Sequence, residues 1–192
     1  MKPPVPSAVL AGIAALALSC AAANPPASVQ EQAREESVIV GETTREQIEE
    51  AVPDWAQSGA ESSPDAAASQ ALATVPPGAE VTVFLGTWCG DSRREVPRFW
   101  KALDLSGGAV PFEIHYIGVD RQKEEPSAPV TNNDIRYVPT FIVQREGREV
   151  GRIVESCPNG IEKDLLALLT GQAQGLITTR TDLTAPGSPS SP

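Results

Sequence analysis

The sequence predicts an α/β protein in which helices cover both faces of a mixed central sheet. Residues 81–119 have the pattern of a strand, a helix and a second strand, and a crossover of that kind makes a right-handed parallel pair. Two more strands flank Glu146-Gly147, whose composition is typical of a hairpin turn, so these two run antiparallel. An amphipathic helix follows them. A crossover, a hairpin and a closing helix together require a mixed sheet.

The domain that carries these elements is expected at residues 81–172. Residues 81–85 are a continuous apolar run, which is typical of a buried strand. Residues 91–105 are expected to form a helix, because apolar side chains recur there at spacings of three and four: Val96, Phe99, Trp100 and Leu103. The remaining strands are expected at 112–119, 140–143 and 149–154. Asn159 is expected to cap the last helix, whose apolar stripe is Ile161, Leu165, Leu168 and Leu169.

An N-terminal extension at residues 37–80 is expected to pack on this domain. A short strand is predicted at 37–41. Thr44 and Gln47 have the spacing of a capping box, so a helix begins there. An alanine-rich helix is predicted at 65–74, before the main domain.

The first residues of the chain have the pattern of a secretion signal, assigned to 1–19. Lys2 provides a positive start, and the apolar run at 8–19 is shorter than the roughly 20 residues that span a bilayer. Cys20 follows directly and resembles the lipidated cysteine of bacterial lipoproteins. Cleavage after Ala23 is the alternative. Both predict export into an oxidising compartment, at the periplasmic face of a bacterial envelope, and the first adds a lipid anchor in a membrane.

Two segments of low complexity flank the predicted folded part. Residues 20–36 are small, polar and proline-containing, as expected of a tether. Residues 173–192 are expected to form a mostly disordered tail, because the sequence from Asp182 lacks core-forming residues.

Charge and composition narrow the function classes. The net charge is -10, which argues against binding a nucleic-acid backbone. Besides Cys20 there are two cysteines, Cys89 and Cys157, too few for a disulfide framework and therefore candidates for chemistry. One histidine and two thiols make a poor zinc set, so no metal and no cofactor is expected. A monomer is expected.

Cys89 is the strongest candidate for a reactive group. It lies between the end of a predicted strand and the start of a predicted helix, where unpaired N–H groups and the helix dipole favour a thiolate. Arg93 and Arg94 add positive charge one turn later and are candidates for stabilising that thiolate, although either can be an ordinary solvated helix residue. Trp88 supplies an apolar neighbour.

Two stretches resemble the thioredoxin superfamily. VFLGTWCGDSRREVPRFWKAL, residues 83–103, is similar to its active-site strand and helix, with Pro97 eight residues after Cys89. IRYVPTFIVQREGREVGRIV, residues 135–154, is similar to its cis-proline loop and terminal hairpin. The resemblance implies a thioredoxin-like fold, here with an N-terminal helical extension.

The resemblance also implies roles for individual residues. Cys89 is the nucleophile, and Ser92 and Pro139 complete the catalytic set, with Pro139 in the cis form. The groove for thiols or disulfides of exported proteins is lined by Trp88, Gly90, Val138 and Thr140.

This sequence departs from the family pattern at two positions. Val83 stands where many thioredoxins bury an acid, and Ser92 replaces the resolving cysteine, although its hydroxyl can hydrogen-bond the Cys89 thiolate. A mixed disulfide on Cys89 must therefore be released by a substrate thiol, a small thiol or Cys157. Cys157 is either that resolving thiol or a semi-buried loop cysteine.

Three functions stay open. The first is thiol-disulfide exchange of the reductase or isomerase type, with Cys89 as the single nucleophile. The second is a non-catalytic binding module. The third is a monothiol glutaredoxin-like role, since residues 89–92 fit C-G-x-S, and it ranks last because Trp88 and Pro97 resemble thioredoxin.

Overall fold

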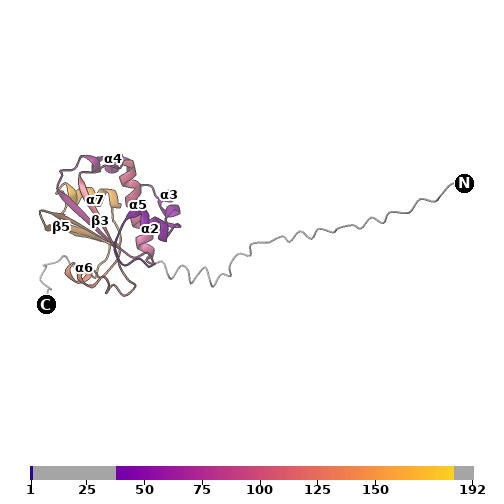
Figure 1. The fold of residues 1–192 in the computed structure, drawn as a ribbon. Coiled ribbons are helices and arrows are strands. Elements are labelled where there is room, and N and C mark those ends of the chain that lie inside the picture. The colour runs from indigo at the N-terminus through magenta and orange to yellow at the C-terminus, as the bar shows by residue number, and fades with distance from the viewer. Residues whose placement is uncertain (2–37, 184–192) are drawn as a thin grey trace.

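The fold is a single six-stranded mixed sheet with helices packed on it (Figure 1). The computed structural model describes Met1 and residues 38–183. The strands are β1 (Gly41–Thr43), β2 (Ala79–Leu85), β3 (Phe112–Gly118), β4 (Thr140–Arg145), β5 (Arg148–Val154) and β6 (Gly175–Ile177). The helices are α2 (Arg45–Ala51), α3 (Trp55–Glu61), α4 (Ala66–Ala71) with the 3-10 turn η1 (Leu72–Thr74), α5 (Gly90–Leu105), α6 (Ser127–Asn132) and α7 (Ile161–Leu169).

The strand order is β1-β3-β2-β4-β5-β6. β2 pairs parallel with β3 and antiparallel with β4, and β4 and β5 form the hairpin across Glu146-Gly147. The predicted crossover, hairpin and mixed sheet are therefore confirmed.

Two apolar cores lie on opposite faces of the sheet. The alternation of side chains along β2 divides them, since Val81, Val83 and Leu85 enter the larger core while Phe84 enters the smaller one. The larger core is covered by α2, α3, α5 and α7, and the predicted stripes of α5 and α7 are buried in it. The smaller core is covered by α6 and the loops around it, which lie across the sheet from α5 and α7 in Figure 1. Helices thus cover both faces, as expected.

The sheet extends beyond both predicted boundaries of the domain. β1 comes from the N-terminal extension and pairs antiparallel with β3. A strand was expected at 37–41, and the observed strand begins four residues later, at Gly41. β6 pairs parallel with β5, so the prediction of a disordered tail was wrong for Gly175–Ile177. Its main-chain groups find partners on β5, which a sequence of few apolar residues does not reveal.

The helix boundaries differ in part from those that the sequence predicts. The capping box of Thr44 and Gln47 is confirmed at the start of α2. The cap predicted at Asn159 was wrong: Gly160, with φ of 94°, occupies the cap position of α7, while Asn159 donates through its backbone and side chain to Asp164. α3 and α6 were not predicted.

The signal peptide, the tether and Cys20 lie outside the described residues, as do residues 184–192. Among the described residues, no helix combines the length and the apolar character needed to cross a membrane.

Candidate active site

Cys89 is the N-cap residue of α5 and is partly buried. Its backbone N–H donates to the Gly86 carbonyl at 2.9 Å, and its own carbonyl accepts from the Arg93 N–H at 3.0 Å. The turn after β2 and the first turn of α5 therefore hold this residue from both sides. Cys89 is a free thiol.

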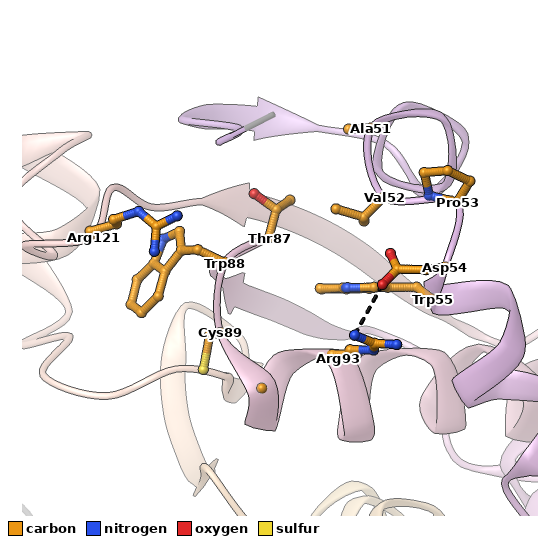
Figure 2. Close-up of a pocket in the computed structure, with 11 residues that line it drawn as sticks. Ala51, Val52, Pro53, Asp54, Trp55, Thr87, Trp88, Cys89, Arg93 and Arg121 are labelled. Carbon is orange, nitrogen blue, oxygen red and sulfur yellow. Dashed lines mark ion pairs between the residues drawn. The ribbon is translucent and has the colours of Figure 1, made fainter. Parts of the chain in front are cut away.

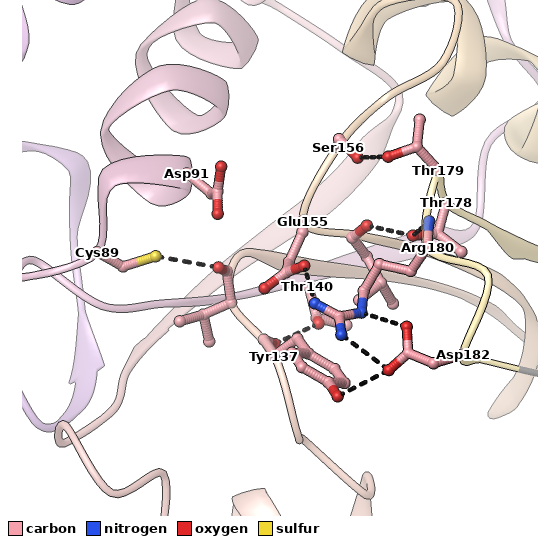
Figure 3. A network of polar contacts seen from close by, with 12 residues as sticks. Cys89, Asp91, Tyr137, Thr140, Glu155, Ser156, Thr178, Thr179, Arg180 and Asp182 are labelled. Carbon is pink, nitrogen blue, oxygen red and sulfur yellow. Dashed lines mark hydrogen bonds and ion pairs between the residues drawn. The ribbon is translucent and has the colours of Figure 1, made fainter.

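The thiol of Cys89 faces the loop before β4 (Figure 3). Its Sγ donates to the Val138 carbonyl oxygen at 3.1 Å, and the Val138-Pro139 peptide bond is cis. Thr140 is buried, and its hydroxyl donates to the Tyr137 carbonyl at 2.7 Å. The structure thus brings together Cys89 and the Val138-Pro139-Thr140 loop, which are about 50 residues apart in the sequence. A second cis bond, Glu125-Pro126, was not predicted.

Trp88 is held in a fixed orientation beside Cys89. Its indole N–H donates to the Val119 carbonyl at 3.0 Å, and its ring packs against the smaller core. A Cβ atom at Gly86 would lie 2.6 Å from the ring, so glycine is required there for the ring to lie close to the backbone. Arg121 and Lys123 lie over the ring, 5.9 and 5.5 Å from its centroid.

Ser92 is fully buried one turn into α5. Its Oγ accepts a hydrogen bond from the Gly86 N–H at 3.2 Å. In this structure the Cys89 thiol donates its hydrogen bond to the Val138 carbonyl and not to Ser92. The Ser92 hydroxyl instead stabilises the turn at Gly86, which precedes Cys89. Its hydrogen bond to a Cys89 thiolate stays a prediction.

The two arginines after Cys89 are both paired with carboxylates. Arg93 lies 3.0 Å from Asp54, and Arg94 lies 2.7 Å from Asp91 and 2.9 Å from Glu95. Each positive charge is therefore balanced locally, which weakens its effect on a nearby thiolate. Stabilisation of the thiolate by these arginines stays a prediction.

Cys157 lies on the other face of the sheet from Cys89. It is a free thiol that packs against the larger core, whereas Cys89 packs against the smaller one. Burial raises the pKa of the Cys157 thiol far above its usual range, and the Glu95 carboxylate beside it adds to the shift. A thiol that stays protonated is a poor nucleophile, so this environment does not suit a resolving cysteine.

Buried acids near α5 were missed by the sequence analysis. Val83 is apolar and buried as expected, but Glu95 is only 6% exposed and Glu162 only 1%. Glu162 accepts from the Arg98 guanidinium at 2.9 and 3.2 Å and from the Asp65 backbone N–H at 3.0 Å. This cluster joins the extension to α5 and α7. In the sequence, the only sign of these buried acids is that Glu95 and Glu162 lie on the apolar faces of their helices.

A second polar cluster supports the cis-proline loop from the C-terminal side (Figure 3). Arg180 stacks on Tyr137, with 3.8 Å between the guanidinium carbon and the ring centroid, and pairs with Glu155 and Asp182, each at 2.8 Å. The Glu155 N–H donates to the Pro139 carbonyl at 2.8 Å. The segment after β6, expected to be a tail, therefore holds the loop that faces Cys89.

A pocket of about 390 Å³ opens beside the cysteine (Figure 2). Residues 51–55 of the extension form one wall, and residues 87–90 form the other. Arg93 and Arg121 also line it. Trp88 and Gly90, predicted as groove residues, thus face a pocket whose second wall was not predicted. Among residues 38–183, no group of three or more His, Cys, Asp or Glu side chains is arranged to hold a metal ion.

The strand order, the cis-proline before β4 and a cysteine at the start of the crossover helix define a thioredoxin-like fold. The chain is similar to a thioredoxin-like protein of Acanthamoeba polyphaga mimivirus, with 26% identity over 98 residues, which cover 51% of this chain and 68% of that protein. No family model matches the chain.

Two solved structures can be superimposed on this one. The first is a protein of unknown function from Pseudomonas aeruginosa, with 17% identity and a TM-score of 0.49, covering 72% of this chain and 98% of that one. The second is an HIV epitope-scaffold, with 19% identity and a TM-score of 0.43, covering 72% of this chain and 88% of that one.

Proposed function

We propose that this protein carries out thiol-disulfide exchange with exported proteins through Cys89 as its single nucleophilic thiol. The observation that carries the proposal is the contact between the Cys89 thiol and the Val138 carbonyl, directly before a cis-proline. That contact places a free thiol at a helix N-terminus and against the loop that contains the cis-proline. The distant relation to a thioredoxin-like protein supports the same chemistry.

The exchange begins when the Cys89 thiolate attacks one sulfur of a substrate disulfide. The substrate S–S bond breaks, a bond forms between Cys89 and the attacked sulfur, and the other substrate sulfur leaves as a thiolate that takes up a proton. Ser92 has no sulfur with which to expel the product. A second thiol must therefore attack the mixed disulfide. A substrate thiol gives isomerisation, and an external thiol gives reduction.

The environment of Cys157 argues against internal release. Its thiol packs on the larger core, and burial keeps its pKa high. Cys157→Ala is therefore the matched control for Cys89→Ala, since each variant removes one of the two described thiols. The proposal predicts that only Cys89 matters for exchange.

The test is capture of a peptide disulfide by the reduced protein, followed by acid quenching and mass spectrometry. We expect a mixed disulfide with wild type and with Cys157→Ala, and none with Cys89→Ala. Equal capture by Cys89→Ala would overturn the proposal. A wild-type protein that binds the peptide without exchange would support the binding module, and brown, iron-containing protein would support the glutaredoxin-like role.

We further propose that the protein is exported and anchored by a lipid on Cys20. The apolar run at 8–19 and the cysteine directly after it support this. Mass spectrometry of the mature N-terminus from cell membranes is the test. A lipidated Cys20 is expected, with release into the soluble fraction in Cys20→Ser. A mature chain that begins at Asn24 would instead support ordinary signal cleavage.

A further inference from the structure

The pocket beside Cys89 has the size and position of a small-molecule site. Its volume of about 390 Å³ lies within the range of about 300–1,000 Å³ that ligand pockets occupy. Residues 51–55, from the last residue of α2 to the first residue of α3, form the wall opposite Cys89 (Figure 2). The extension therefore turns one side of the reactive cysteine from an open surface into a pocket.

The charge at this pocket is positive although the chain is acidic. Arg121 lines the pocket, and neither Arg121 nor its neighbour Lys123 lies within ion-pair distance of a carboxylate in the described part of the chain. Both cations are held over the Trp88 ring. Arg93 and Asp54 also line the pocket, but they pair with each other. The net charge of the chain is -10, so an unpaired arginine in the pocket wall, with Lys123 over the same Trp88 ring, indicates an anionic ligand.

The remaining walls are apolar. Val52 and Trp55 from the extension face Trp88 across the pocket, and Trp55 is almost fully buried. A ligand that fits these surfaces has a short aliphatic body and a carboxylate for Arg121. Cys89 lines the same pocket, and its Sγ is hydrogen-bonded to the Val138 carbonyl in this structure. A ligand that reacts with this residue carries sulfur.

We propose that this pocket binds a small carboxylate-bearing thiol, which releases the mixed disulfide from Cys89; the inference rests on the proposed function. In the mixed disulfide, the Cys89 sulfur has no proton to donate to the Val138 carbonyl, so that hydrogen bond is lost. The ligand thiolate attacks the Cys89 sulfur, the bond to the substrate sulfur breaks, and the substrate leaves as a thiol. A second ligand thiol then attacks the ligand sulfur on Cys89. The two ligand molecules leave as their disulfide and supply both electrons.

The test compares three small thiols on a preformed mixed disulfide between the full chain and a peptide. They are 3-mercaptopropionate, which is anionic, 2-mercaptoethanol, which is neutral, and cysteamine, which is cationic. Each release rate is divided by the rate of the same thiol with a free cysteine-peptide mixed disulfide, which removes differences in intrinsic reactivity. We expect 3-mercaptopropionate to be favoured about fivefold over 2-mercaptoethanol, as an exposed charge pair allows, and cysteamine to be disfavoured.

Arg121→Gln should abolish this preference, and Arg121→Lys should retain most of it. Arg148→Gln is the matched control, because Arg148 is an exposed arginine at the far end of the β4–β5 hairpin. Equal normalised rates for the three thiols, or a preference that survives Arg121→Gln, would overturn the inference and leave the proposed function intact. Failure of Cys89 to form the mixed disulfide at all would overturn the proposed function itself.

Discussion

Glu162 is the residue whose replacement tests how the extension is held on the domain. Its carboxylate is 1% exposed and accepts hydrogen bonds from Arg98 and from the Asp65 backbone. Glu162→Ala leaves these donors without their acceptor. We expect the free energy of unfolding to fall by about 3 kcal/mol, the lower end of the range for breaking a buried ion pair. The lower end applies because the Arg98 side chain is 30% exposed and can be partly hydrated.

Urea unfolding followed by tryptophan fluorescence measures this loss. With a slope of about 2 kcal/mol per M, the midpoint should fall by about 1.5 M. Glu113→Ala is the control, because Glu113 is 76% exposed and lies 3.6 Å from His115, and it should change stability by less than about 0.5 kcal/mol.

A double variant separates the ion pair from simple loss of packing. The double variant Arg98→Met with Glu162→Met removes both charges and fills a similar volume. Its loss of unfolding free energy should be smaller, by at least about 1 kcal/mol, than the summed losses of the single variants Arg98→Met and Glu162→Met. A midpoint shift for Glu162→Ala no larger than that for Glu113→Ala would contradict a stabilising role for the buried Glu162 carboxylate. Strict additivity in the double variant would also refute it.

Two predictions concern the sulfur chemistry. Ser92→Cys places a second sulfur one turn from Cys89, so release of the mixed disulfide should no longer depend on added thiol. A mixed-disulfide lifetime that still varies with the concentration of added thiol would contradict this. The raised pKa of Cys157 means that its thiol stays protonated at pH 9, where an ordinary thiol is mostly ionised. Iodoacetamide should therefore label Cys157 in folded Cys89→Ala at least about tenfold more slowly than in urea, and equal rates would show that the site is open.

The parts of the fold that were predictable have strong local patterns. The apolar run of β2 and the apolar stripes of α5 and α7 are visible without neighbours, because burial of one face imposes a period on the sequence. α3 and α6 have no such period. Each is at most seven residues long and buries one side chain, Trp55 in α3 and Val130 in α6, so only tertiary contacts stabilise them.

The candidate site was predictable only where one element contains the signal. Cys89 and the Val138-Pro139 bond each belong to a short motif, and the structure joins the two motifs by a hydrogen bond. The placement of Cys157 against the larger core depends on which side of the sheet its loop crosses. The buried Glu162 depends on Arg98 and on the Asp65 backbone, which are distant in the chain. A local sequence pattern cannot show partners that are so far away in the chain.

The serine at position 92 is best understood together with the extension. Its hydroxyl supports the Gly86 turn, so the position contributes to holding Cys89 and not to releasing what Cys89 binds. Cys157 packs on the other core with a raised pKa, so in the proposed exchange release falls to a substrate thiol or an external thiol. An external thiol acts faster when it is bound close to the sulfur that it attacks. In the proposed mechanism, the extension supplies the second wall of the pocket beside Cys89, and a thiol bound there performs the release that Ser92 cannot perform.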